Sequence, residues 1–436
     1  MIGGVQNIAR ITELRQRILF TFGMLAVYRL GAFIVTPGIN ADVIRSFFEQ
    51  AAGTMFGLFS MFSGGALEQL SIFSLGIMPY ISASIIFQLL TVVVPSLEAL
   101  KKEGEQGTKK INQYTRYATI GLALFQSLLI SIALEGGQFG EGAVITPGWG
   151  FRLMCMITLT TGTAFIMWLG EQITERGIGN GISLIIFTGI VIRIPSALGQ
   201  LFRLIQTDQF SILETLFIAV LIVAVVLFVV VVERGQRRIP IQHARRVVGK
   251  RVMQGGMSYF PLRVNTAGVI PAIFASSLLM FPLTIAQFTS SPAIQGFINI
   301  YLNPSSWVYQ VVYISLIIFF CYFYTAIMID PADVADNIKK SGAYIPGIRP
   351  GKKTAEHIDR ILTRITLVGG LYMSAVCVLP TLLAIRFNVP FYFGGTALLI
   401  VVGVGLDTIS QVESHLVSRQ YEGFVKGTRI RGRLGR

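Results

Sequence analysis

The sequence predicts an all-α polytopic membrane protein, and three observations predict it. Of its 436 residues, 53% are hydrophobic and only 13% are charged, which leaves too few charges for a soluble chain of this length. Apolar runs of the roughly 20 residues that a membrane span needs recur along the chain. Lysine and arginine give the chain a net charge of +14, and they collect in the short segments between these runs. Such clustering is typical of cytoplasmic loops.

Ten helical spans are predicted, and an even number of spans puts both termini on one side of the membrane. The first apolar run lacks a small-residue cleavage site, so it is expected to remain as the first span and not to be removed as a signal. The predicted spans are residues 18–35, 77–94, 117–134, 151–169, 182–201, 212–232, 267–288, 307–329, 361–385 and 392–409.

The basic residues predict which loops face the cytoplasm. The segment from Glu233 to Val264 carries eight basic residues against one acidic residue, whereas the segment from Phe288 to Trp307 carries no charge. Because cytoplasmic loops are enriched in lysine and arginine, the first segment is expected inside and the second outside. The arginines at the end of the chain follow the same parity, so both termini are expected in the cytoplasm.

A segment between the first two spans does not fit either of them. Residues Phe59 to Ser74 are apolar, but they are too short for a span and are interrupted by Ser63-Gly64-Gly65 and by Glu68. We interpret this segment as re-entrant. Irregular backbone at membrane depth persists only where protein or a water-filled cavity surrounds it, so the chain is expected to enclose a cavity. One long kinked span with a ragged start is the alternative.

Two apolar segments resemble one another. The second span has Pro79 within Ile77 to Ile81, and the seventh span has Pro271 within Val269 to Ile273. Such paired prolines indicate an inverted repeat, although prolines are common enough in membrane helices for chance to remain an alternative. Each proline is expected to bend its helix. The predicted organisation is an N-terminal half (residues 1–200), an outer hinge (residues 201–211) and a C-terminal half (residues 212–436).

The sequence gives little support to catalysis. The three histidines, His243, His357 and His415, lie in loops or at a span end, and there is no HExxH or Walker lysine motif. The three cysteines, at positions 155, 321 and 377, lack metal-site spacing and are expected to be packing residues. We therefore expect no enzyme activity, no metal and no cofactor.

Ionisable residues inside the spans would favour ion-coupled transport. The chief examples are Arg29 in the first span and Asp407 in the tenth. We interpret Arg29 as a side chain that snorkels to the outer surface and Asp407 as a group near the cytoplasmic interface. A secondary transporter of inverted-repeat design remains the alternative function.

Isoleucines stand four residues apart in two of the predicted spans. Ile77 and Ile81 share one helix face, as do Ile182 and Ile186. Isoleucine in a membrane helix usually faces lipid or packs against a neighbour. If these side chains face a cavity, they form an apolar constriction that closes by dewetting.

Long motifs along the chain indicate a family. They are MFSGGAL (61–67), GIMPYISAS (76–84), GEQITERGIGNG (170–181), VERGQRR (232–238), AGVIPAIFA (267–275), PGIRPG (346–351) and FYFGGT (391–396). With these motifs in this order, the sequence resembles the SecY family of protein translocase channels along nearly its full length. The resemblance implies ten transmembrane helices in two inverted pseudo-symmetric halves around a central pore. The pore would pass unfolded preproteins across the bacterial cytoplasmic (inner) membrane.

The resemblance also implies site residues. A plug helix at about residues 63–74, with Ser63, Gly64, Gly65, Ala66 and Leu67, would block the outer side of the pore. The pore ring would be Ile77, Ile81, Ile182, Ile186, Ile273 and Ile400. A lateral gate, with Pro79, Ser84, Phe87, Pro271, Ser276 and Leu278, would release membrane helices into lipid. Partners would dock on Arg234, Arg237, Arg238, Arg245, Arg246 and Arg349.

The implied partners are proteins. The family implies a clasping small subunit, SecE, and a peripheral one, SecG. The SecA ATPase or a translating ribosome would dock on the basic loops, and the substrate would be an unfolded preprotein with a signal sequence. Ribosomal RNA contact would suit the arginine cluster from Arg234 to Arg251, because basic residues release counterions when they bind phosphates.

Overall fold

The computed structural model describes residues 11–50, 63–140, 142–195, 199, 206, 212–243, 246–248, 251–253, 256–287, 296, 301, 306–387 and 395–427. The chain divides into two compact units. The first unit is Met1–Ser196 with Val404–Arg436, and the second is Ala197–Gly403. The predicted halves and their hinge remain predictions, and of the hinge only Gln206 lies among the described residues.

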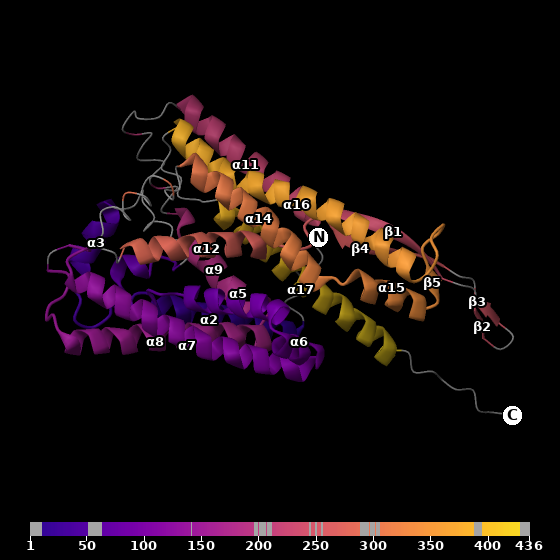
Figure 1. Cartoon of the computed structure of the whole chain (residues 1–436), viewed down its shortest axis with the longest axis horizontal. Coiled ribbons are helices and arrows are strands. Elements are labelled where there is room, and N and C mark those ends of the chain that lie inside the picture. Colours follow the sequence, from indigo (N-terminus) through magenta and orange to yellow (C-terminus); the bar gives the residue numbers. More distant parts are fainter. Residues whose placement is uncertain are drawn as a thin grey trace. The chain divides into compact units, whose positions relative to one another are not determined.

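Each predicted span overlaps a helix in the described part of the chain (Figure 1). In the first unit these helices are α2 (Thr12–Gly31), α5 (Met78–Val93), α7 (Glu105–Glu135), α8 (Trp149–Arg176) and α9 (Gly181–Val191). In the second they are α11 (Ile212–Arg234), α12 (Ile270–Gln287), α14 (Trp307–Met328) and α16 (Lys352–Phe387), while α17 (Gly395–Gly427) begins in the second unit and continues into the first.

Among the described residues, six helices are long and apolar enough to cross a membrane. A seventh is added if α5 and α6 (Pro95–Lys102), which are bent by 96°, count as one span. Helix α2 has the length, at 20 residues, but it carries Arg15, Arg17 and Arg29. Helix α9 is apolar but has only 11 residues. The chain is thus a multi-pass membrane protein. The ten spans predicted from the sequence agree with the positions of the helices.

Helices α7 and α8 pack closely along their length (Figure 1). A stripe of small side chains makes this possible, because Thr115, Thr119, Ala123, Ser127 and Ser131 recur every four residues and all are buried. Small residues let two membrane helices approach until their backbones are near contact. The hydroxyls also have partners within their own helix, as Thr119 Oγ1 donates to the carbonyl oxygen of Thr115 at 2.7 Å.

The two prolines of the repeat do not bend their helices, so this expectation was wrong. Pro79 is the second residue of α5 and Pro271 is the second residue of α12. The first turn of a helix has backbone N–H groups without intrahelical partners, so a proline there removes no hydrogen bond and begins the helix favourably. The prolines mark where the two helices begin.

The structural correspondence of the two segments goes further than the prolines. Three residues before each proline lies a glycine with positive φ, Gly76 at +56° and Gly268 at +64°. Aligned from these glycines, residues 76–84 and 268–276 share glycine, proline, isoleucine, alanine and serine at the same five positions. The same turn therefore introduces the same kind of helix in both units, which supports the repeat.

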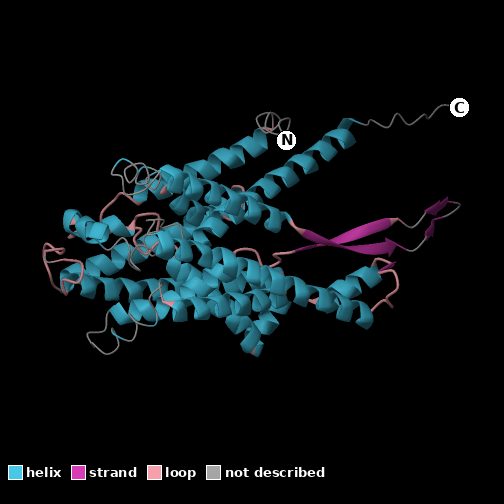
Figure 2. Ribbon diagram, turned by 90° about the horizontal axis from the view of Figure 1, so that it is seen from above, coloured by secondary structure: helices cyan, strands magenta, loops and turns pink. Residues whose placement is uncertain are grey.

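The basic segment between α11 and α12 is a β-sheet and not a loop. Strand β1 (Gln236–His243) pairs with β4 (Met257–Arg263), and β5 (Ala343–Tyr344) pairs with the other side of β1 near its end. The short strands β2 (Arg246–Val248) and β3 (Arg251–Met253) form a second pair between β1 and β4. Figure 2 shows β1 and β4 as two long paired arrows, and we name this pair the ribbon.

The ribbon has one buried face and one exposed face. In β1, Ile239 and Ile241 are buried while Arg238 and Pro240 are exposed, the alternation that a half-buried strand requires. Its buried face packs against α15 (Pro331–Lys340) and the first turns of α16. This core consists of Ile239, Ile241, Leu262, Ile338, Ala343, Ile345, Ile358 and Leu362. The ribbon thus has a hydrophobic core of its own, and each large apolar side chain buried there stabilises it by about 1.5–3 kcal/mol.

Candidate functional site

The predicted plug segment is irregular among its described residues. Its regular structure is the single 3-10 turn η1 (Leu67–Gln69), where the family resemblance implies a longer helix. The residues from Phe59 to Phe62 lie outside the described residues. Gly64 and Gly65 have φ values of +64° and +86°, which favour glycine over other residues. The Ser63 hydroxyl accepts a hydrogen bond from the backbone N–H of Leu67 at 3.3 Å, and this bond closes the turn.

The end of the plug segment is bound to the residues that follow α2. The backbone N–H of Thr36 donates to the carbonyl oxygen of Leu70, and that of Ile72 donates to Ile34, each at 2.9 Å. Leu70 has a φ of +42°, the one positive value at a non-glycine residue in the described chain. The left-handed conformation costs a non-glycine residue about 1–2 kcal/mol. Complete burial of Leu70 and the bond to Thr36 hold it there.

Helix α8 also approaches this segment closely. A Cβ atom added to Gly162 would lie 1.9 Å from the carbonyl oxygen of Ile72, so only glycine allows this contact. The segment is therefore held by α2 and α8 from within the first unit.

A tight turn at the GEQITERGIGNG motif places helix α9. The Asn180 side chain caps the helix by accepting bonds from the N–H groups of Ile182 and Ser183 at 3.1 and 3.3 Å. A Cβ atom added to Gly181 would lie 1.9 Å from the Gly170 carbonyl oxygen, so α8 and α9 meet backbone to backbone. The turn thereby sets the position of Ile182 and Ile186, which lie in the first turns of α9.

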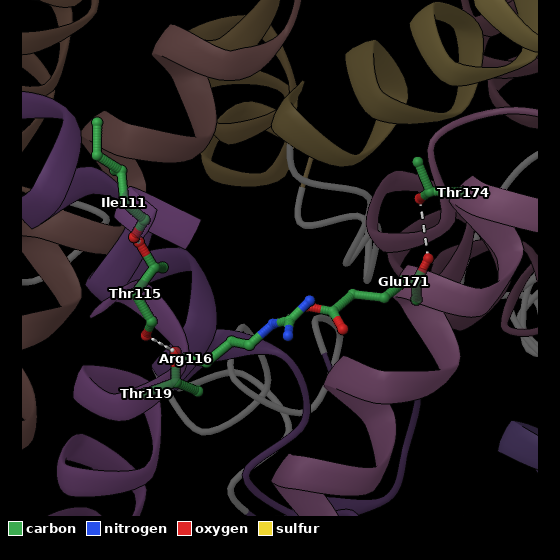
Figure 3. Close-up of polar contacts among 7 residues, drawn as sticks. Ile111, Thr115, Arg116, Thr119, Glu171 and Thr174 are labelled. Atoms are coloured by element: carbon green, nitrogen blue, oxygen red, sulfur yellow. Dashed lines mark hydrogen bonds and ion pairs between the residues drawn. The ribbon is translucent and has the colours of Figure 1, made fainter. Parts of the chain in front are cut away.

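The same motif binds α8 to α7 (Figure 3). Arg116 of α7 donates from Nε to Oε1 of Glu171 at 2.6 Å. Thr174 Oγ1 donates to the Gly170 carbonyl oxygen and accepts from the N–H of Gly181, both at 2.9 Å. The polar groups of one short segment thus join three helices of the first unit.

The predicted pore-ring residues are apolar groups largely withdrawn from solvent. Ile77, Ile81, Ile186 and Ile400 are buried, whereas Ile182 and Ile273 are partly exposed. Positions 77, 81, 182 and 186 lie in the first unit, while positions 273 and 400 lie in the second. The closure of the ring by both units therefore remains a prediction.

The predicted gate residues have their contacts within each unit. The ring of Phe87 in α5 stacks on that of Tyr114 in α7, with 6.3 Å between centroids. Ser84 Oγ accepts from Gln88 Nε2 at 3.3 Å, and Ser276 Oγ donates to the Ile273 carbonyl oxygen at 2.9 Å. Leu278 is exposed. Helices α5 and α12 belong to different units, so their meeting at a gate remains a prediction.

The predicted docking arginines lie on and beside the ribbon. Arg234 at the end of α11 and both Arg237 and Arg238 of β1 are exposed, and Arg246 lies in β2. Arg245 lies outside the described residues. Arg349 is exposed on the turn between β5 and α16, where Gly347 and Gly351 have φ values of +80° and +100°. The Thr354 hydroxyl donates to the Arg349 carbonyl oxygen at 3.0 Å and stiffens this turn.

A hollow beside Arg349 was not anticipated from the sequence. Its volume is about 480 Å³, and the side chains that line it are mostly basic. Lys353, His357 and Arg360 repeat at intervals of four and three residues on one face of α16, a spacing that could have revealed the cluster. Lys353 is paired with Glu356 at 3.0 Å. The lining residues are Gly347, Ile348, Arg349, Lys353, Glu356, His357 and Arg360.

The snorkelling interpretation of Arg29 was wrong. Its Nη1 donates to the Gly64 carbonyl oxygen at 2.8 Å, and its guanidinium carbon lies 4.7 Å from the centroid of the Phe33 ring. Arg193, just after α9, forms an ion pair with Glu68. Neither Arg29 nor Arg193 was predicted to touch the plug segment. A charge inside an apolar run was the available signal for Arg29, because such residues usually face the protein interior.

Comparison with known proteins agrees with these features. The model of the SecY family matches residues 71–409. The protein translocase subunit SecY of Escherichia coli strain K12 is 52% identical over 423 residues, which cover 96% of each chain. The protein translocase subunit SecY of Aquifex aeolicus is 45% identical over 419 residues, or 95% of this chain and 97% of the relative.

Solved structures show the same fold. The structure of a protein conducting channel has a TM-score of 0.68 at 18% identity and covers 93% of each chain. A SecY structure described for the role of its plug domain in stabilising the closed state has a TM-score of 0.67 at 19% identity, with the same coverage. The family match over most of the chain, together with relatives of this similarity, shows that the chain belongs to the SecY family.

Proposed function

We propose that this chain is the channel-forming subunit of a Sec translocase. It passes unfolded preproteins across the bacterial cytoplasmic membrane and releases membrane helices sideways into lipid. The observation that carries this proposal is 52% identity to a protein translocase subunit over 96% of both chains. Such coverage includes the motifs of the predicted plug segment, the α8–α9 turn, the ribbon and the Arg349 turn.

The pore ring suits this function for a physical reason. A channel for many sequences has to avoid binding any one side chain strongly. Isoleucine offers no hydrogen bond, and its branched side chain narrows the opening and closes it to ions by dewetting. The isoleucines of α5 and α9 are held by backbone turns at Gly76 and Gly181, so the constriction has rigid supports.

We propose SecA and the translating ribosome as docking partners, with the ribbon and the Arg349 turn as their surface. A cytoplasmic position of both termini follows from the charge of these segments. Two solved structures with this fold belong to complexes of related channels with ribosomes, one canine and one from yeast. The small subunits SecE and SecG, and lipid at the lateral gate, complete the proposed set of partners.

Import into vesicles tests the function. Inverted membrane vesicles containing this chain with its small subunits, supplied with SecA and ATP, are expected to protect a signal-bearing preprotein from added protease. Omission of ATP or of the signal sequence serves as the control, because either omission should abolish protection. If protection never develops while a small solute is taken up against a gradient, the chain is a secondary transporter and the proposal fails.

A further inference from the structure

Three polar side chains outside the plug segment bind it where it turns. Arg29 of α2 donates to the Gly64 carbonyl oxygen at 2.8 Å, and Tyr28 of the same helix donates to that of Ser63 at 3.3 Å. On the other side, Arg193 forms an ion pair with Glu68 of η1. All of these residues belong to the first unit. These contacts therefore do not depend on the second unit.

The Arg29 side chain is partly buried, and the bond from its Nη1 atom is one of the contacts that hold its charge. Its Nε atom is buried and has no hydrogen-bond partner in the described part of the chain. Loss of a hydrogen-bond partner is costly for a charged group that is partly withdrawn from water, because its charge is then incompletely solvated. Among the described residues, the Gly64 carbonyl and the face of Phe33 are in contact with this charge.

The backbone between these contacts is closely packed. A Cβ atom added to Gly64 would lie 2.8 Å from the Cα atom of Gly189 in α9, and Gly64 has a φ of +64°. The turn at Gly64 can therefore rest against α9 only because residue 64 is glycine. Arg193 follows α9 by two residues, so α9 supplies both the packing surface and a neighbouring charge.

We propose that Arg29 and Arg193 are positioning residues of the plug, and that together they form a latch that keeps the resting channel sealed. One arginine holds the plug backbone at Gly64, and the other holds the Glu68 carboxylate. Because both contacts join the plug to the first unit alone, the plug stays with that unit in the resting state. This inference rests on the proposed channel function and adds to it the residues that set how easily the plug leaves.

If these contacts form a latch, weakening them is expected to let ions leak through the resting channel. In the complete channel complex in planar bilayers, Glu68→Gln or Arg193→Gln is expected to raise resting ion conductance about two- to fivefold, since a partly exposed ion pair contributes modestly. Arg29→Gln is expected to raise it more. The exchange of both charges, Glu68→Arg with Arg193→Glu, is expected to restore conductance towards the original value. A merely structural role would not be rescued in this way.

A matched control and an independent variant complete the test. Glu98→Gln removes a carboxylate from the exposed Glu98–Lys102 pair of α6, at 2.6 Å, and is expected to leave conductance unchanged. Gly64→Ala keeps every charge but displaces the plug from Gly189, so it should also leak. Immunoblotting of the membranes confirms that each variant accumulates, and Arg193→Lys, which keeps the positive charge, is expected to leak less than Arg193→Gln.

The outcomes separate the latch from the channel function. If the unmodified chain imports a preprotein but Glu68→Gln, Arg193→Gln and Gly64→Ala all keep its low conductance, the latch is wrong and the channel stands. Leakage in the single variants that the charge exchange does not reverse also contradicts the latch. Failure of import by the unmodified chain counts against the proposed function instead.

Discussion

At the scale of single residues, the isoleucines and glycines have roles that depend on chemical groups that their side chains do not carry. The pore-ring isoleucines offer neither charge nor hydrogen bond, and the glycines at positions 162, 181 and 64 lack the Cβ atom that would separate their backbones from neighbours. The arginines of the plug region show the opposite case, because a cation within apolar surroundings needs a specific acceptor. Arg29 finds that acceptor in a backbone carbonyl.

The isoleucine ring gives a prediction at this scale. Replacing Ile81, Ile186 and Ile273 together with glycine is expected to raise resting ion conductance in planar bilayers, because shorter side chains let the constriction fill with water. A triple glycine variant at Ile157, Val220 and Leu227, which are exposed on α8 and α11, provides the control for general loss of helix stability. If ring and control variants conduct equally, the ring has no part in the seal.

At the scale of elements, the ribbon and the Arg349 turn act as a unit. The turn leaves β5 and enters α16, and both ends are held by the core beneath the ribbon, where Ile345 and Ile358 are buried. Positive φ at Gly347 and Gly351 makes the turn tight, and Thr354 secures it. A stiff turn presents the Arg349 charge with little loss of conformational freedom when a partner binds.

Arg349→Glu is therefore expected to impair docking and not folding. Import driven by SecA should fall by about tenfold or more, because the reversed charge opposes an acidic contact, while the amount of chain in the membrane stays unchanged. Arg349→Lys should retain part of the activity. Lys110→Glu, an exposed charge reversal on α7, serves as the control. Loss of the Arg349→Glu chain from the membrane would show instead that this arginine is structural.

At the scale of the whole molecule, two units with the same helix-starting turn suggest a channel that opens between them. Residues 76–84 and 268–276, which contain these turns and the first turns of α5 and α12, share five residues at matching positions. We predict that these two helices meet at a lateral gate when the channel is idle. The positions to test are Ser84 or Phe87 on α5 and Ser276 or Leu278 on α12.

Cysteine crosslinking measures this directly. After Cys155, Cys321 and Cys377 are replaced by serine, at least one pair of cysteines across α5 and α12 is expected to join, since a disulfide needs Cα atoms about 4.4–6.8 Å apart. The bond should block import, and a long flexible crosslinker at the same pair should restore it. A cysteine pair at Ser127 and Thr160, whose hydroxyl oxygens lie 3.5 Å apart across α7 and α8 within one unit, is the positive control. If only this control pair joins, the gate assignment is wrong.

The sequence alone determined the membrane class, the presence of a helix in each of the ten predicted spans, and the family. A long hydrophobic run predicts a helix in a bilayer directly, because the backbone N–H and C=O groups of a spanning segment have to form hydrogen bonds within that segment. Long motifs such as GEQITERGIGNG identified the family. The alternation of buried Ile239 and Ile241 with exposed residues is a sequence signal for a strand of the ribbon. The density of arginines in that segment led us to expect a loop instead.

Only the tertiary structure decided which partners the irregular segments and isolated charges have. It placed Pro79 and Pro271 at helix starts, because a helix boundary depends on the turn before it and not on the proline alone. It also joined Arg29 to Gly64 and Arg193 to Glu68, 35 and 125 residues apart in the chain. Such contacts leave no periodic pattern in the sequence, since a single side chain and a distant carbonyl meet only when the helices that carry them are packed.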